Sequence, residues 1–127
     1  RIQVMGFQFF LLVGLGGAIG SMGRAMVGTL LQSFSPWPTV LVNVIGAFLI
    51  GFLVRAMEGM SDPDFFRAFW ILGVCGGFTT FSAFGLDLFN LMEDEGSAHS
   101  LAYLTLSLVG TISGVYLGFR AFTALNG

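Results

Sequence analysis

The sequence predicts an all-α membrane protein in which four membrane-spanning helices form a single domain over residues 1–127. Two observations predict this class. Of the 127 residues, 55% are hydrophobic and only 9% are charged, whereas soluble domains carry about 25% charged residues. The apolar residues also fall into four segments, each long enough to cross the hydrocarbon core, for which a helix needs about 20 residues. The single cysteine, Cys75, excludes an intrachain disulfide.

Three polar loops separate the four expected helices. The helices are expected over residues 4–31, 39–57, 65–92 and 101–125. The first loop, 33–38 (SFSPWP), holds two prolines around Trp37, an aromatic residue typical of the membrane interface. The second, 58–64 (EGMSDPD), and the third, 93–100 (EDEGSAHS), are rich in acidic residues. An even number of spans places both ends of the chain on one side of the membrane.

The middle of the third apolar segment, residues 76–84 (GGFTTFSAF), predicts a break in that helix. Two adjacent glycines and two adjacent threonines disfavour a continuous helix. Hydrocarbon cannot satisfy the backbone groups that a break releases, so protein, water or an ion must do so. In transporters, interrupted helices at the middle of the membrane commonly hold ions.

The glycines of the first and fourth helices lie at a spacing of four residues. Gly16, Gly20 and Arg24 share one face of the first helix. Gly110, Gly114 and Gly118 share one face of the fourth. Small residues at this spacing let membrane helices approach closely. We expect both faces to be packing surfaces.

Neutral hydrogen-bond donors lie in the second and fourth helices. Asn43 carries an amide that either makes an interhelical hydrogen bond or binds an anion. Tyr103, Ser107 and Thr111 form a polar stripe at a spacing of four. Their hydroxyls either bond to the preceding helical turn or line an ion path. Ser113 lies off this face and is a weaker candidate.

The predicted break adds aromatic and backbone groups. Phe81 and Phe84 share a face of the helix that follows it, and the positive edge of an aromatic ring attracts an anion weakly. The carbonyls of Gly76 and Thr79 could replace the water around a monovalent cation. Two copies of the chain, related by a twofold axis, would supply four such oxygens.

Two charged side chains lie within the apolar segments. Arg24, in the first helix, either attracts anions to a pore mouth or extends to the membrane surface. Asp87, near the far end of the third helix, is likewise either a functional charge or a residue in contact with water. At the ends of the spans, Arg1, Arg55, Arg67 and Arg120 all fall on the side of the termini. The positive-inside rule therefore favours termini in the cytoplasm.

Three motifs together resemble the Fluc (CrcB) family of microbial fluoride channels. They are GSMGR at 20–24, NVIGAF at 43–48 and GGFTTFSAF at 76–84. The similarity extends over the whole chain, and the third motif is highly specific. Many members of the family carry threonine where this chain has Ala83, so a polar role at that position is in doubt here.

The resemblance implies a function and a site. Members of this family are antiparallel, dual-topology homodimers with two fluoride pores, and a structural sodium ion at their centre is held by backbone carbonyls. The resemblance maps these carbonyls to Gly76 and Thr79 and the vestibule arginine to Arg24. It maps the fluoride pore to Asn43, Phe81, Phe84, Tyr103, Ser107 and Thr111. It also implies passive export of cytoplasmic fluoride across the lipid bilayer of the bacterial inner (plasma) membrane. Dual topology conflicts with the one-sided arginines, which favour one orientation.

Two other functions remain open from the sequence. A small proton-coupled multidrug-type exporter would have a similar size and dimeric plan, but it needs a membrane carboxylate, and the first helix offers only Arg24. A membrane scaffold that assembles through its glycine faces is the second. No nucleophile, base or metal cluster lies at a useful spacing, so we expect no enzyme. No basic cluster suggests a nucleic-acid partner.

Overall fold

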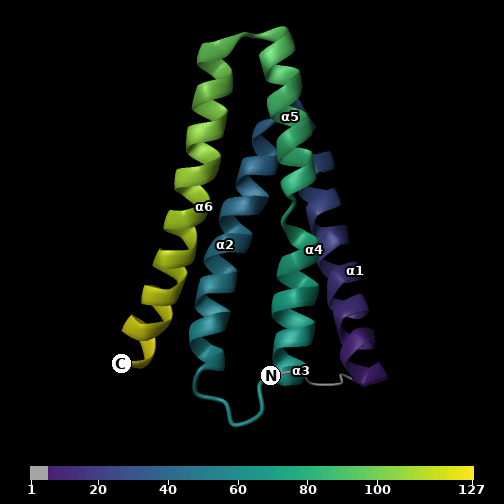
Figure 1. Cartoon of the computed structure of the whole chain (residues 1–127), viewed down its shortest axis with the longest axis vertical. Helices are drawn as coiled ribbons and strands as arrows, with labels where there is room; N and C mark the ends of the chain where they lie inside the picture. Colours follow the sequence, from purple (N-terminus) through teal and green to yellow (C-terminus); the bar gives the residue numbers. More distant parts are fainter. Residues whose placement is uncertain (1–5) are drawn as a thin grey trace.

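The computed structural model describes residues 6–127, which form membrane-length helices joined by short connections (Figure 1). Helix α1 covers Phe7–Leu30 and α2 covers Trp37–Met57. The third segment comprises α3 (Asp64–Phe66), a π-helical stretch (Arg67–Cys75), α4 (Gly76–Phe78) and α5 (Phe81–Asp94). Helix α6 covers Ser97–Asn126. Four segments are long and apolar enough to cross a membrane, namely Phe7–Leu30, Trp37–Met57, Asp64–Asp94 and Ser97–Asn126. The predicted multi-pass membrane protein is therefore confirmed.

The helix boundaries differ from the sequence prediction where prolines and small residues cap the helices. Pro38, predicted to lie in a loop, occupies the first turn of α2, where its missing N–H costs no helical hydrogen bond. The third loop is only Glu95 and Gly96, because Gly96 turns the chain sharply at a φ of 83°. Val4, where the first helix was expected to begin, lies outside the described residues.

Glycine faces bring the helices together in two pairs. In α1, an added Cβ on Gly20 would meet the Val74 carbonyl oxygen and the Phe78 nitrogen. In α6, a Cβ on Gly118 would meet the Phe48 carbonyl oxygen of α2. The contacting atoms belong to the backbone in both cases, so these helices touch without intervening side chains. The predicted packing role of the glycine faces is confirmed.

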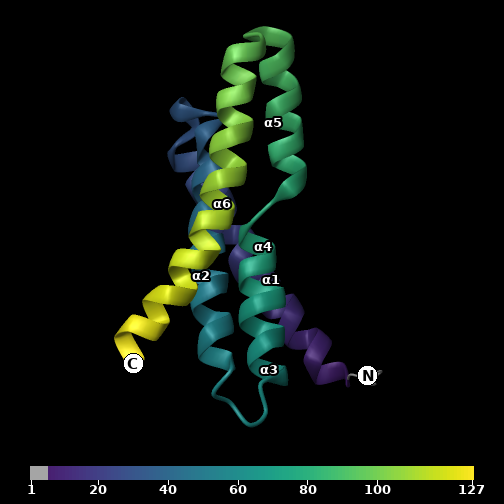
Figure 2. The same ribbon diagram turned by 60° about the vertical axis from the view of Figure 1, so that its left-hand side comes forward.

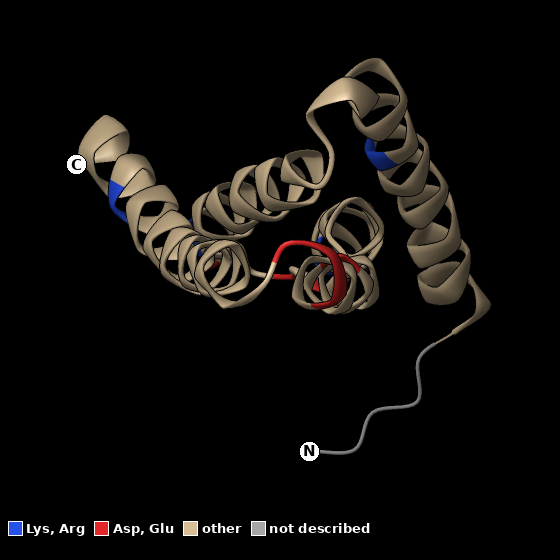
Figure 3. Ribbon diagram, turned by 90° about the horizontal axis from the view of Figure 1, so that it is seen from above, with Lys and Arg blue, Asp and Glu red and all other residues tan. Residues whose placement is uncertain are grey.

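The two ends of the helical bundle differ in charge. The start of α1 and the end of α6 lie at the same end (Figure 1), where Arg55 pairs with Glu58 at 2.9 Å and Arg67 with Asp64 at 3.7 Å. The turn between α5 and α6, at the opposite end, is acidic (Figure 3). Arg1, the fourth arginine of the predicted cytoplasmic side, lies outside the described residues.

Candidate functional site

The third membrane segment changes direction where two threonines leave the helical conformation. Thr79 has φ −89° and ψ 158°, and Thr80 has φ −152° and ψ 122°, so both are extended. Gly76 is helical, with φ −63° and ψ −35°. The interruption thus lies at the threonines and not at the glycines. In Figure 2 the extended link leads from α4 to α5, which does not continue the line of α4. The link lies near the middle of the 31-residue span Asp64–Asp94.

Asn43 of α2 replaces the helical hydrogen bonds that Thr80 lacks. The Thr80 N–H donates to Asn43 Oδ1 at 2.8 Å, and Asn43 Nδ2 donates to the Thr80 carbonyl at 3.0 Å. One amide side chain therefore satisfies the donor and the acceptor of a single extended residue. The interhelical hydrogen bond considered for Asn43 is present, and the second Nδ2 hydrogen leaves one further donor.

The side chain of Thr80 caps the helix that follows. Its Oγ1 accepts a hydrogen bond from the Ala83 N–H at 3.1 Å, as expected of a threonine at an N-cap. Because of this cap and the Asn43 bond, two carbonyls lose their usual partners. In a continuous α-helix the Gly76 carbonyl would accept from Thr80, and the Thr79 carbonyl from Ala83. Both N–H groups donate elsewhere.

A cavity of about 590 Å³ lies beside the extended link, between α2, the third segment and α6. Its walls are mostly apolar, with a few polar groups. Most of the residues that the sequence assigned to an ion path line it together: Asn43, Gly76, Thr79, Phe81, Phe84, Ser107 and Thr111. Tyr103 and Arg24 are not among the residues that line it.

Ser107 presents an unpartnered hydroxyl in the wall of this cavity. The residue is only 5% exposed, and its Oγ has no hydrogen-bond partner within the described residues. A buried hydroxyl without a partner is unfavourable. Among buried side-chain polar atoms in residues 6–127, it is the one left unsatisfied, so its hydrogen-bonding capacity is not used by the described residues.

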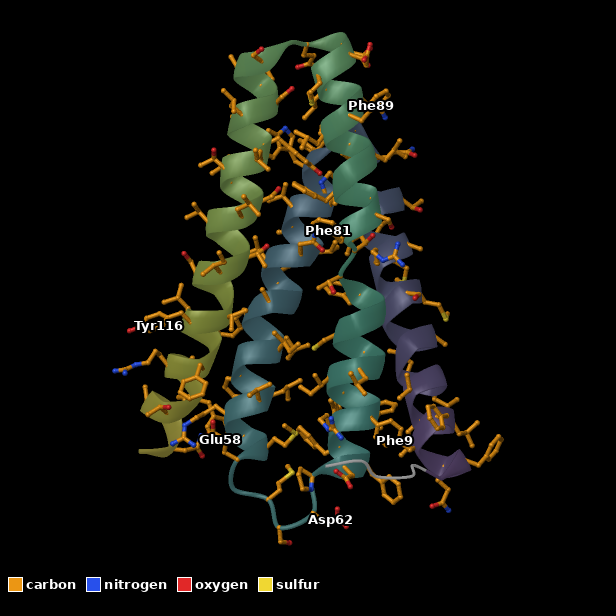
Figure 4. The ribbon with its side chains drawn as sticks, viewed as in Figure 1. Phe9, Glu58, Asp62, Phe81, Phe89 and Tyr116 are labelled. Carbon is orange, nitrogen blue, oxygen red and sulfur yellow. The ribbon has the colours of Figure 1, made fainter. Side chains whose placement is uncertain are left out.

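Phe81 and Phe84 lie at the start of α5 and differ sharply in exposure. Their ring centroids are 5.6 Å apart. Phe84 is 7% exposed and stacks on Tyr103 at 5.7 Å, whereas Phe81 is 83% exposed. Figure 4 shows Phe81 at the level of the extended link. The two rings therefore extend from the buried interior of the chain to its surface.

Asp87 accepts two hydrogen bonds from within the protein. Tyr103 Oη donates to Asp87 Oδ2 at 2.9 Å, and Thr39 Oγ1 donates to the same oxygen at 2.6 Å. Asp87 is only half-buried, so it combines these protein partners with access to water. Sequence reasoning did not single out Thr39. A carboxylate inside an apolar segment, 16 residues before a tyrosine on the next helix, was the signal that could have identified this cluster.

Arg24 of α1 contacts the end of α4, next to the extended link. Its Nε donates to the Gly77 carbonyl at 3.0 Å, and Ser21 Oγ donates to the same oxygen at 3.5 Å. Arg24 also borders a second cavity of about 350 Å³, whose lining includes Thr29, Thr39 and Thr80. Arg24 thus contacts the third segment just before its interruption and also lines this second cavity.

Comparison with known proteins assigns the chain to a family. The family model for "CrcB-like protein, Camphor Resistance (CrcB)" matches residues 11–119. A protein of Rhizobium meliloti is 44% identical over 91% of this chain and 96% of its own length. For a protein of Opitutus terrae the identity is 42%, over 94% and 96%, and for one of Thermus thermophilus it is 38%, over 97% and 100%. All three relatives are named "Fluoride-specific ion channel FluC". The resemblance seen in the sequence motifs is confirmed, and the chain belongs to the CrcB-like family.

Proposed function

We propose that this protein is a fluoride-selective ion channel that passively exports cytoplasmic fluoride. The observation that carries the proposal is the family membership, with relatives of matching length that are named as fluoride-specific channels. The protein is accordingly an ion transporter and not an enzyme. The organisms of these relatives are bacteria, and the bacterial inner (plasma) membrane is the proposed location.

The chemistry of the larger cavity suits a small, strongly hydrated anion. Removing water from fluoride is costly unless donors replace that water. Asn43, Ser107 and Thr111 provide neutral donors around the cavity, and the Ser107 hydroxyl makes no hydrogen bond to the described residues. Neutral donors bind an anion more weakly than a fixed cation would, and conduction requires that the ion can leave. The proposed path comprises Asn43, Phe81, Phe84, Tyr103, Ser107 and Thr111.

The path is completed by a second, antiparallel copy of the chain. Two features support this assembly. Phe81 is 83% exposed beside the cavity, and a ring proposed to line a pore needs a wall opposite it. The N–H groups at the start of α5 lie near the middle of the membrane, where lipid offers no hydrogen-bond partner. Dual topology runs against the one-sided arginines, and the nearby acids Glu58 and Asp64, paired with Arg55 and Arg67, do little to weaken that bias.

A structural sodium ion is proposed at the extended link, held by the carbonyls of Gly76 and Thr79. The residues fit such an ion because the N–H groups that would normally bond to these two carbonyls donate to Asn43 and to Thr80 Oγ1. Carbonyl dipoles can replace the hydration shell of a monovalent cation. Bound sodium would join the two copies and neutralise the free carbonyls.

Sodium should therefore stabilise the purified protein. A ligand that binds only the folded state raises the unfolding temperature as its concentration rises. The thermal midpoint in detergent should be higher in sodium chloride than in N-methyl-D-glucamine chloride of equal ionic strength. Equal midpoints in the two salts over a wide concentration range would exclude the sodium site.

The proposed function is tested by ion efflux from liposomes. Protein is reconstituted into vesicles loaded with potassium fluoride or potassium chloride, and efflux is followed with ion-selective electrodes after valinomycin is added. Rapid fluoride loss with no chloride loss above that of empty vesicles supports the channel. Equal passage of both halides, or of neither, contradicts it. Fluoride flux that needs a proton gradient would instead favour a proton-coupled exporter.

Phe81→Ile should slow fluoride efflux about fivefold, because an aromatic ring edge can contribute about 1 kcal/mol that an aliphatic chain cannot. The substitution removes little packing within the chain, since Phe81 is 83% exposed. The initial efflux rate per unit of reconstituted protein checks this. Phe89→Ile is the matched control, because Phe89 lies on the same helix, is 58% exposed and is farther from the link, toward the turn to α6 (Figure 4). Equal rates in both variants would place Phe81 outside the path.

A further inference from the structure

Arg24 makes a contact that a role in attracting anions does not require. Its Nε lies 3.0 Å from the carbonyl oxygen of Gly77, a residue near the middle of the third membrane span. Arg24 is the only lysine or arginine of α1. Ser21, one turn earlier on the same face, donates to the same carbonyl at 3.5 Å. Two side chains of α1 therefore converge on one backbone oxygen.

That oxygen has lost its helical partner because of the extended link. In a continuous α-helix the Gly77 carbonyl would accept from the Phe81 N–H. Phe81 instead begins a new helix after two extended residues. The last carbonyls of a helix need donors from outside it, and hydrocarbon supplies none. A guanidinium also suits the negative end of a helix dipole.

The backbone of α1 is held firmly at this point. Gly20 contacts the backbone of Val74 and Phe78 so closely that a Cβ would not fit, and Gly23 lies against the Phe78 ring. Arg24 follows one turn after Gly20 on the same face. The backbone of Arg24 is therefore fixed relative to the end of α4. Because of this, its side chain can hold the Gly77 carbonyl in one position.

We propose that Arg24 is a positioning residue whose Nε–H fixes the end of α4 and, through the extended link, the start of α5. Asn43 holds the other end of the link at Thr80. The two side chains, from α1 and α2, therefore hold the backbone on either side of Thr79, at Gly77 and at Thr80. This role depends on a donor atom at the Nε position, whereas attraction of anions to a vestibule depends on the charge.

Three substitutions separate the donor from the charge. In Arg24→Gln the Nε2 amide occupies the same place along the side chain as the arginine Nε, so a donor remains and the charge is lost. Arg24→Met places a methyl group there and has neither. Arg24→Lys keeps the charge but has a methylene at that place, with its nitrogen one bond farther out. Arg120→Met, which removes an exposed arginine from α6, is the control for loss of a charge elsewhere.

Two measurements are made on the full-length protein in lipid. Hydrogen–deuterium exchange reports the protection of backbone amides in peptides covering residues 76–84. The second measurement is fluoride efflux, which rests on the proposed function. It is made at about 1 M salt, where the Debye length of about 3 Å suppresses attraction of the ion by distant charges. If the unaltered protein passes no fluoride, the proposed function fails, and the exchange data still decide the role of Arg24.

The donor role predicts that Arg24→Met and Arg24→Lys speed exchange in this segment and slow efflux, each about tenfold, the effect of losing one hydrogen bond to a charged group. Arg24→Gln rescues most of both losses, and Arg120→Met changes neither. Rescue by lysine and not by glutamine would overturn the proposal in favour of a charge effect. Equal loss in all three variants, or loss in none, would overturn it as well. If the Arg24→Met variant does not fold, comparing Arg24→Gln with Arg24→Lys still distinguishes the donor role from a charge effect.

Discussion

Asn43→Asp should reduce fluoride efflux by about a hundredfold or more, to the level of protein-free vesicles. In the structure, Asn43 Oδ1 accepts from the Thr80 N–H and Nδ2 donates to the Thr80 carbonyl. An aspartate can keep the first bond, but its second oxygen faces the carbonyl, and two acceptors repel each other. The substitution also places a negative charge beside an anion path. Two like charges about 4 Å apart repel by about 4 kcal/mol at an effective dielectric constant of about 20, and a barrier raised by this amount is more than a hundredfold in rate.

The measurement is fluoride-electrode efflux per unit of reconstituted protein, with elution from a sizing column to show that the variant keeps its assembly. Asn90→Asp is the matched control, since it makes the same chemical change at an exposed position of α5 and should leave efflux unaltered. Efflux from the Asn43→Asp variant at the unaltered rate would remove Asn43 from the ion path. It would also show that the link at Thr80 tolerates the loss of its donor.

The fold follows from the sequence to the extent that hydropathy and glycine spacing determine it. Apolar length alone predicts the four spans. The spacing of Gly16 and Gly20 predicts a close helical contact, and the structure shows this contact with the third span. The sequence does not say which helix each glycine face will meet, because that depends on the rotation of every helix in the bundle.

The partners of the polar groups were harder to predict, because they come from distant parts of the chain. Arg24 and Gly77 are 53 residues apart, and Thr39 and Asp87 are 48 apart. Sequence analysis leaves two possible roles for Asn43, and the structure shows one amide bonded twice to Thr80. Such a pairing requires an extended residue at one height on one helix and an amide at the same height on another. Neither the composition nor the periodicity of the sequence shows which residues of two helices lie at the same level in the bundle.

The Asp87 cluster also combines residues from three parts of the chain. Thr39, in the first turn of α2, and Tyr103 of α6 both donate to Asp87 of α5, and Tyr103 in turn stacks on Phe84. The sequence shows that Asp87 is a charge within an apolar segment, but not that Thr39, 48 residues earlier, lies beside it. The buried ring of the proposed path is thus supported by side chains whose proximity only the fold reveals.

Gly20→Ala should destabilise the protein by about 2–3 kcal/mol and lower its thermal midpoint by roughly 10 °C or more. A Cβ at this position would meet the Val74 carbonyl oxygen and lie 2.7 Å from the Phe78 nitrogen. Backbone atoms cannot rotate away as the end of a side chain can, so α1 would have to move off the third span. Arg24 is carried by the same helix, and its bond to Gly77 at 3.0 Å would lengthen with that movement.

Gly28→Ala provides the comparison on the same helix, because a Cβ at Gly28 meets nothing within 4 Å. Alanine favours a helix over glycine by about 1 kcal/mol, so this variant should be as stable as the unaltered protein or slightly more stable. Thermal unfolding in detergent, followed by the loss of the native elution peak, measures both variants under one set of conditions. Since the two substitutions add the same atom to the same helix, a difference between them isolates the contact with the third span. If both variants melt together, that contact does not hold α1 in place, and the position of Arg24 at the extended link must be fixed by other contacts.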